Sequence, residues 1–313
     1  PDFRFDVLFA QHTISAVAAG RLRSELNTPA VLNFLDYLTG FMETWPVWVM
    51  PPPMVRALTR FELSLPRRFQ VEGVLTVSTP LAERFIATGL PETRVRAIQY
   101  GYDAERFRPA DTPPDADPPV VLMHGSFDQH HLGRIAREAV LRVAQARPET
   151  VFRFVGRETP SLQRFVRELR RERPEARLEM TGFVAYADVA REVRRATLGW
   201  VPYEESNGTH CAFVAKAVEY LGCGIPVAST PLENLRRYFR DELALRFSPD
   251  FTGAGLAAAV LAWLETPASE RRRLGRAASE RVARNLDWSR VTAAAAEFVE
   301  AVVVENRAGI RTR

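Results

Sequence analysis

The stretch that decides the fold is residues 215–230, which read Ala-Lys-Ala-Val-Glu-Tyr-Leu-Gly-Cys-Gly-Ile-Pro-Val-Ala-Ser-Thr. Its first half has the apolar spacing of a helix, and the Gly-x-Gly that follows marks where this helix stops. A short buried strand is expected after Pro226. Lys216 and Glu219 lie three residues apart, so both project from one side of the helix near its N-terminal end.

The N-terminal end of this helix is a suitable seat for phosphate, because its backbone N–H groups are free and the helix dipole is positive there. The Lys216 ammonium and the Glu219 carboxylate beside it suit a ligand that carries a diphosphate and ribose hydroxyls. The alternative is a surface ion pair on an amphipathic helix, which by itself is the commoner explanation. Lys216 is also the only lysine among the 42 basic residues of the chain.

The pattern Lys-x-x-Glu-Tyr-Leu-x-x-Gly-x-Pro-Val at 216–227 resembles the donor-site helix of group-1 glycosyltransferases. That family has the GT-B fold, an α/β architecture in which two Rossmann-like domains with parallel sheets face a cleft. The resemblance covers nearly the whole chain. It implies transfer of a sugar, with retention, from a nucleotide-diphosphate-sugar to a glycan, lipid or small-molecule acceptor in cell-surface polysaccharide or glycoconjugate biosynthesis. It also implies that Glu219 accepts hydrogen bonds from the donor ribose.

Length and composition agree with this class of protein. The 313 residues allow two domains, and 46% hydrophobic with 26% charged residues is ordinary for a soluble globular chain. No apolar run approaches the ~20 residues that span a bilayer, and no signal-peptide pattern opens the chain. Two cysteines form neither a disulfide framework nor a metal set. We therefore expect a cytoplasmic protein, and arginine richness alone does not indicate nucleic acid.

The chain divides at a Pro- and Asp-rich segment, 109–119, which predicts a stiff linker. Residues 1–108 form the expected N-terminal, acceptor-side domain. Its expected strands are 6–10, 30–34, 73–78 and 95–98. A lone four-stranded sheet has an open edge, and the Gly-rich loop that follows the first strand in the family is missing here. We therefore expect this Rossmann-like domain to be incomplete.

The expected C-terminal domain, 120–286, is the nucleotide-sugar-binding one. Strands alternate with helices along it, which predicts right-handed βαβ units and a parallel sheet. The expected strands are 120–125, 151–156, 178–182, 198–202 and 226–229. Residues 287–313 resemble the terminal helix with which the family crosses back to the N-terminal domain.

Further donor-binding residues are expected in the turns that follow two of these strands. Gly125 and Ser126 follow the first strand, where a glycine lets the backbone approach a diphosphate; a plain strand-end turn is an equal alternative. The loop has neither the Arg nor the Lys that the family often places there, which leaves more of the electrostatic task to Lys216. The turn at Gly182, Phe183 and Val184 matches the one that receives the nucleobase in related enzymes.

The polar loop 206–213 leads into the Lys216 helix. We expect Asn207, His210 and Phe213 to meet the donor there. For His210, which could donate to the sugar or to phosphate, an ordinary loop histidine is the favoured alternative. The family's fuller signature has a first glutamate eight positions before the second, where this chain has Cys211. The alternative function is therefore a non-catalytic nucleotide-sugar-binding or assembly protein of the same fold.

No metal and no other cofactor is expected, because GT-B enzymes neutralise the leaving diphosphate with helix N-termini and cationic side chains. Asp128, His130 and His131 are the nearest approach to a metal-binding group. Since all three lie on one short loop, solvated side chains are the favoured interpretation.

On the acceptor side, Asp36 ends the second strand, where a parallel sheet exposes side chains to a ligand. We expect it to orient or deprotonate the acceptor hydroxyl; capping of the next helix is an equal alternative. The segment 45–56 is rich in tryptophan and proline, and arginines follow it. It suits peripheral contact with an anionic membrane, at the inner face of the cell membrane, and a core-packed loop is the alternative.

Overall fold

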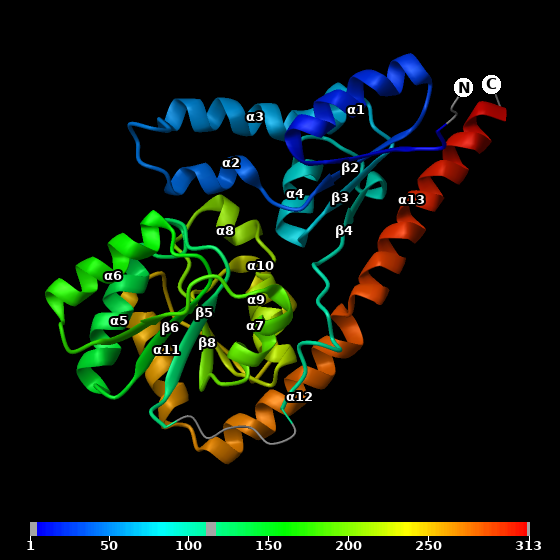
Figure 1. Cartoon of the computed structure of the whole chain (residues 1–313). Coiled ribbons are helices and arrows are strands. Elements are labelled where there is room, and N and C mark those ends of the chain that lie inside the picture. Colours follow the sequence, from blue (N-terminus) through cyan, green and yellow to red (C-terminus); the bar gives the residue numbers. More distant parts are fainter. Residues whose placement is uncertain (1–4, 111–116, 312–313) are drawn as a thin grey trace. The chain divides into compact units, whose positions relative to one another are not determined.

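The computed structural model describes residues 5–110 and 117–311, with side chains up to residue 308 (Figure 1). By their contacts these residues form two compact units. The N-terminal unit holds the chain up to Gly101, residues 206–213 and the chain from Trp288 onward, and the C-terminal unit holds 102–205 and 214–287. Each unit has its own parallel sheet, which is the α/β class expected from the sequence.

The divisions of the chain differ in two places from those expected. Residues 206–213 fall inside the expected C-terminal domain, but their contacts place them in the N-terminal unit. Residues 102–108, expected in the N-terminal domain, belong to the C-terminal unit. Most of the expected linker, residues 111–116, lies outside the described residues.

The N-terminal unit is built on a four-stranded sheet in the order β1-β2-β3-β4, with every neighbouring pair parallel. Its strands are β1 Leu8–Gln11, β2 Ala30–Phe34, β3 Gly73–Thr76 and β4 Val95–Ala97. The two central strands, β2 and β3, are the most buried, because both of their edges and both of their faces are covered. The four expected strands are all present, with ends that differ by at most two residues.

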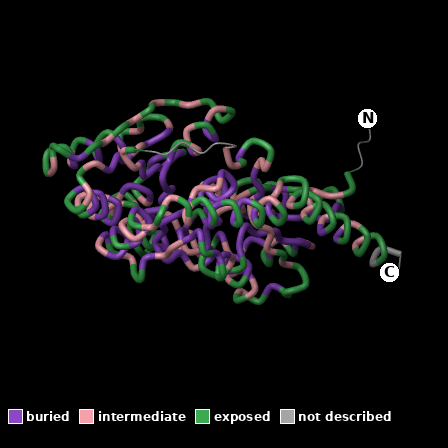
Figure 2. The backbone as a smooth tube through the Cα atoms, turned by 90° about the horizontal axis from the view of Figure 1, so that it is seen from below, coloured by how far each residue is buried: buried purple, intermediate pink, exposed green. Residues whose placement is uncertain are grey.

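Helices and turns connect and cover this sheet. They are α1 His12–Leu26, α2 Leu38–Phe41, a 3₁₀ turn at Met42–Thr44, α3 Pro52–Arg68, α4 Thr79–Ala87, a 3₁₀ turn at Glu92–Arg94, α8 Asn207–Cys211 and α13 Trp288–Arg311. Phe298 and Val302 of α13 form a buried cluster with Val31 and Leu75 of the sheet. Most of α13 is otherwise exposed (Figure 2), so a narrow apolar stripe attaches this long helix to the unit.

Helix α3 has no counterpart among the expected elements, because three prolines begin it. Proline is tolerated in the first helical turn, where its missing N–H would have no partner in any case. Pro51 is the N-cap, and Pro52 and Pro53 lie in the first turn. A run of prolines that looks like a loop therefore starts a helix of 17 residues.

The C-terminal unit has six strands: β5 Val120–His124, β6 Val151–Val155, β7 Arg177–Met180, β8 Leu198–Val201, β9 Val227–Ser229 and β10 Leu245–Phe247. Its helices are α5 Arg134–Ala146, α6 Pro160–Glu172, α7 Tyr186–Val193, α9 Ala215–Gly222, α10 Glu233–Tyr238, α11 Gly253–Glu265 and α12 Ala268–Leu286. The five expected strands are present. The strand β10 and the helices α10 to α12 extend the unit beyond the elements predicted from the sequence.

The strand order of this sheet, β10-β9-β8-β5-β6-β7, creates a switch point. The chain starts at β5, moves outward through β6 and β7, then returns to place β8 on the other side of β5. The loops that follow β5 and β8 therefore diverge at the carboxyl edge of the sheet. In open α/β sheets this is where a ligand binds.

Candidate functional site

Three glycines lie at the carboxyl edge of the six-stranded sheet, one after each of β5, β6 and β7. Gly125 N donates to Val155 O at 3.0 Å, and Gly156 N donates to Gly182 O at 3.2 Å. All three glycines have positive φ, between 70° and 148°, which side chains rarely allow. A Cβ on Gly156 would lie 2.4 Å from Gly125 O, whereas one on Gly182 would meet nothing within 4 Å. At this edge of the sheet the three glycines therefore present backbone that carries no side chain.

Lys216 lies beside the first of these glycines. It is the second residue of α9, and an ideal Cβ on Gly125 would lie 3.3 Å from its Cε and 3.4 Å from its Nζ. Helix α9 begins after Val214, with no side chain capping its first N–H groups. The structure therefore brings together the lysine, the glycine turn and the positive end of a helix dipole, as expected from the sequence. Ser126, next to Gly125, is exposed.

Glu219 is one turn further along α9, and its carboxylate is buried, with 8% of the residue exposed. Tyr186 Oη donates to Oε1 at 3.2 Å. His124 Nε2 lies 3.1 Å from Oε2, within ion-pair distance but without the alignment of a hydrogen bond. Burial and the nearby Glu219 carboxylate raise the pKa of Tyr186, so its hydroxyl remains a hydrogen-bond donor. Neither Tyr186 nor His124 is among the residues expected from the sequence.

The turn after β7 offers an exposed aromatic surface. Phe183 is 69% exposed, and the guanidinium of Arg157 lies 5.3 Å from the centre of its ring. Val184 follows it, half-buried. A ring exposed beside the open space at Gly182 is suited to stacking on a flat heterocycle. The three residues of this expected nucleobase turn therefore lie on the same sheet edge as Lys216.

The solvated interpretation of the loop histidines is wrong for His131. This side chain is buried, and burial and the nearby Lys216 hold its pKa well below the usual range; the same causes lower the pKa of the half-buried His130 to about 4. Asp128 N donates to His131 Nδ1 at 3.2 Å, and His131 Nε2 lies 3.1 Å from Tyr203 Oη. In the sequence, the adjacent histidines are the only sign that this loop is special. The burial of His131 could not be predicted, because it depends on contact with Tyr203 on the loop after β8.

The loop after β5, which carries these histidines, contains the group of side chains that most resembles a metal site. One ligand atom from each of Asp128, His130 and His131 lies within 4.8 Å of the others. Both ring nitrogens of His131 are already within hydrogen-bond distance of protein groups, and the Lys216 cation is close enough to lower the pKa values of both histidines. This donor set does not fit a metal ion.

Residues 206–213 belong to the N-terminal unit, whereas Lys216 belongs to the C-terminal unit. Asn207 N and Nδ2 donate to the Glu43 carboxylate at 2.8 and 2.7 Å, and Arg84 donates to Asn207 Oδ1. The side chain of Asn207 thus joins α8 to the N-terminal unit, which favours a packing role. Phe213 is buried and His210 half-buried.

Asp36 follows β2 at the carboxyl edge of the N-terminal sheet. It does not cap the next helix, because Tyr37 is the N-cap of α2 and no side chain caps that helix. Burial and the nearby Glu62 carboxylate raise the pKa of Asp36 to about 6. At neutral pH it is therefore mainly a carboxylate, with a proton affinity suited to a general base.

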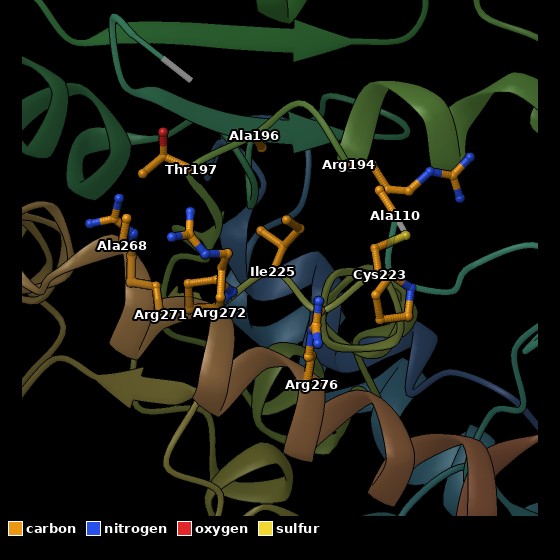
Figure 3. A pocket seen from close by; sticks show the side chains of 13 residues that line it. Ala110, Arg194, Ala196, Thr197, Cys223, Ile225, Ala268, Arg271, Arg272 and Arg276 are labelled. Atoms are coloured by element: carbon orange, nitrogen blue, oxygen red, sulfur yellow. The ribbon is translucent and has the colours of Figure 1, made fainter. Parts of the chain in front are cut away.

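A small cavity in the C-terminal unit contains none of the expected site residues. It has a volume of about 70 Å³ and lies next to the start of β8 and of β9, where Thr197 and Pro226 line it. Figure 3 shows Ile225 and Cys223 within it and arginine side chains, among them Arg276, around it. This is the amino edge of the sheet, opposite the glycine turns, so we do not place the functional site there.

Comparison with known proteins agrees with the fold. A family model described as "Glycosyl transferase-like" matches residues 134–297. No curated protein sequence matches the chain. In the described part of the chain, no helix combines the length and apolar character needed to cross a membrane.

Solved structures extend the likeness to nearly the whole chain. A sucrose-phosphate synthase from Thermosynechococcus elongatus is 18% identical with a TM-score of 0.78, over 97% of this chain and 75% of that one. HepE from Anabaena, solved in complex with UDP-glucose, is 18% identical with a TM-score of 0.72, over 95% and 79%. A glycosyltransferase from Rickettsia africae is 12% identical with a TM-score of 0.63, over 95% and 98%. At these identities the likeness shows the fold, which is GT-B.

Proposed function

The chain belongs to the glycosyl transferase-like family, and on this premise we propose that it transfers a sugar from a nucleotide-diphosphate-sugar to an acceptor hydroxyl. The observation that supports this best is the position of Lys216 and Glu219. Both stand on the first turns of α9, at the switch point of the sheet, with Lys216 beside the bare backbone of Gly125 and Glu219 beside His124. Solved HepE structures contain UDP or UDP-glucose, which supports the same class of donor here.

The chemistry assigned to the site follows from its charges. The bond between the anomeric carbon and the β-phosphate oxygen breaks, a bond to the acceptor oxygen forms, and the acceptor proton leaves. Negative charge grows on the departing diphosphate, where the Lys216 ammonium and the N–H groups of α9 stabilise it. Glu219 accepts hydrogen bonds from the ribose. Asp36 is the proposed base for the acceptor, and retention at the anomeric carbon is proposed from the family resemblance.

We place this reaction in the cytoplasm, in the assembly of cell-surface polysaccharide or glycoconjugate.

A second candidate is a non-catalytic nucleotide-sugar-binding protein, and one observation favours it: Cys211 stands where the family signature has its first glutamate. Incubation with UDP-, GDP-, ADP- and TDP-linked sugars, preceded by a thermal-shift screen of the same set, separates the two. Transfer or slow donor hydrolysis supports the enzyme. A thermal shift without turnover supports the binding protein, and no shift with any of them contradicts both.

Activity is expected to be independent of metal ions. The Lys216 ammonium and the N-terminus of α9 supply positive charge at the proposed diphosphate site, and the Asp128–His131 group does not fit a cation. The check is the rate of donor hydrolysis before and after treatment with EDTA. Unchanged rates agree with this account, whereas loss with EDTA and recovery with magnesium or manganese contradict it.

The exposed loop with Trp45 and Trp48 supports contact between the N-terminal, acceptor-side unit and a lipid surface. Trp48 is 85% exposed, so the core-packed alternative is wrong for this side chain. Its neighbours Trp45, Val47, Val49 and Met54 are also exposed, as are Arg56 and Arg60 on α3. No acidic residue occurs between Glu43 and Glu62. We propose that this surface contacts an anionic membrane, with a lipid-linked acceptor.

Replacing Trp48 by glutamine is expected to weaken co-sedimentation with phosphatidylglycerol vesicles while hydrolysis of soluble donor is retained. An interfacial tryptophan contributes apolar burial, and each nearby arginine adds roughly 1 kcal/mol, which salt screens. Leu243→Gln, which removes a side chain that is 69% exposed in the other unit, is the matched control. Equal sedimentation of both variants and the unmodified protein, or binding insensitive to salt, is the contrary result.

A further inference from the structure

The Lys216 ammonium has a fixed partner inside the C-terminal unit. Its Nζ donates to Tyr203 Oη at 3.1 Å. Tyr203 belongs to the loop after β8, on the far side of the switch point from Gly125, and only 5% of it is exposed. Two loops that diverge at the sheet edge are therefore linked through a buried phenol beside the proposed diphosphate position.

His131 holds the same phenol from the opposite loop. Because Asp128 N donates to Nδ1 of this imidazole, Nδ1 carries no proton in the neutral ring. The proton is then on Nε2, which lies 3.1 Å from Tyr203 Oη and donates to it. The tautomer follows from this hydrogen-bond pattern. Burial and Lys216 both lower the pKa of His131, so the ring is neutral near pH 7.

Two donors therefore converge on one oxygen. A phenol has one donor hydrogen and two acceptor lone pairs, and Lys216 and His131 occupy both lone pairs. The Tyr203 hydrogen is then left for a third group, and the contacts of Oη in the described part of the chain include no acceptor for it. A neutral donor next to a cation suits an anionic oxygen.

We propose that Tyr203 is a second phosphate-binding residue of the donor site, its hydroxyl oriented by His131 and Lys216 to donate to the diphosphate. This inference rests on the proposed function. It also accounts for the loop after β5, which lacks the Arg and Lys expected from the family: its His131 positions a neutral donor on the neighbouring loop instead. His131 is a positioning residue, and Tyr203 touches the ligand.

The test compares binding of a nucleoside diphosphate with binding of the matching nucleoside. UDP, GDP, ADP and TDP are screened first, and calorimetry then measures the selected pair. Tyr203→Phe keeps the ring, so diphosphate affinity should fall about tenfold while nucleoside affinity is unchanged. Tyr238→Phe, at the end of α10, is the matched control and should match the unmodified protein for both ligands.

A double-mutant cycle separates direct contact from an effect through the lysine. If Tyr203 binds phosphate itself, Tyr203→Phe lowers diphosphate affinity again in a Lys216→Ala background. No further loss there, or equal losses for diphosphate and nucleoside, overturns the proposal. Should Tyr203→Phe not fold, His131→Phe removes the orienting donor instead: a several-fold loss for the diphosphate alone supports the proposal, and unchanged affinity overturns it. Failure of the unmodified protein to bind any of the four diphosphates would instead count against the proposed function.

Discussion

Replacing Lys216 by alanine is expected to reduce kcat about 100-fold and to weaken donor binding much less. The leaving diphosphate gains charge toward the transition state, so a cation beside it stabilises the transition state more than the bound donor. The measurement is steady-state kinetics of transfer or donor hydrolysis, together with calorimetric affinity for the donor. Equal losses in kcat and affinity would assign Lys216 to ground-state binding alone.

Lys216→Arg is the conservative control for this experiment. Arginine keeps the charge, but its planar guanidinium distributes that charge over a fork of donors instead of a compact ammonium. Nζ of the lysine lies close to both Tyr203 and the turn at Gly125, so the larger head group cannot reproduce both contacts. We expect partial recovery of kcat. Full recovery would show that only the net charge matters.

Replacing Glu219 by alanine is expected to weaken donor binding by about 1.5–3 kcal/mol, roughly tenfold or more in Kd, because a buried carboxylate loses its hydrogen bonds to the ribose. Calorimetry of a folded variant provides the measurement, with the melting temperature as the check of folding. Unchanged donor affinity would remove Glu219 from the site.

Tyr186→Phe is the informative companion to the Glu219 variant. In this structure the Tyr186 hydroxyl donates to Oε1 of Glu219, so it occupies one of the two carboxylate oxygens that could accept from a ribose hydroxyl. If the ribose replaces this bond, loss of the tyrosine hydroxyl leaves donor affinity unchanged or higher. A loss as large as that of Glu219→Ala would mean that Tyr186 itself contacts the donor.

Much of the architecture follows from local sequence. The bounds predicted for β2 are those observed, because a short, mostly apolar run between a Thr-Pro turn and an aspartate favours a buried strand. The helix–Gly–Pro–strand pattern around Lys216 likewise predicts α9 and β9. By contrast, α3 was missed, since the prolines that exclude a helix interior are compatible with its first turn.

The site was predictable only where one element carries the chemistry. Lys216 and Glu219 lie on one helix, so their three-residue spacing predicts that both side chains project from the same side of it. The arrangement of His131 and Tyr203 depends on two loops that are 72 residues apart in the chain, and no local pattern shows that they meet. The loop 206–213 illustrates the same limit: it directly precedes the Lys216 helix, yet hydrogen bonds to Glu43 and Arg84 attach it to the other unit.

We propose above all that a nucleoside diphosphate binds at the carboxyl edge of β5 and β8, held by α9. The most direct measurement is a crystal structure with the nucleoside diphosphate that gives the largest thermal shift. We expect the diphosphate to lie against Gly125, within hydrogen-bond distance of Lys216 Nζ, with the ribose hydroxyls on Glu219. A diphosphate bound elsewhere, for example at the arginine-lined cavity of the amino edge, with Lys216 and Glu219 unoccupied, would contradict it.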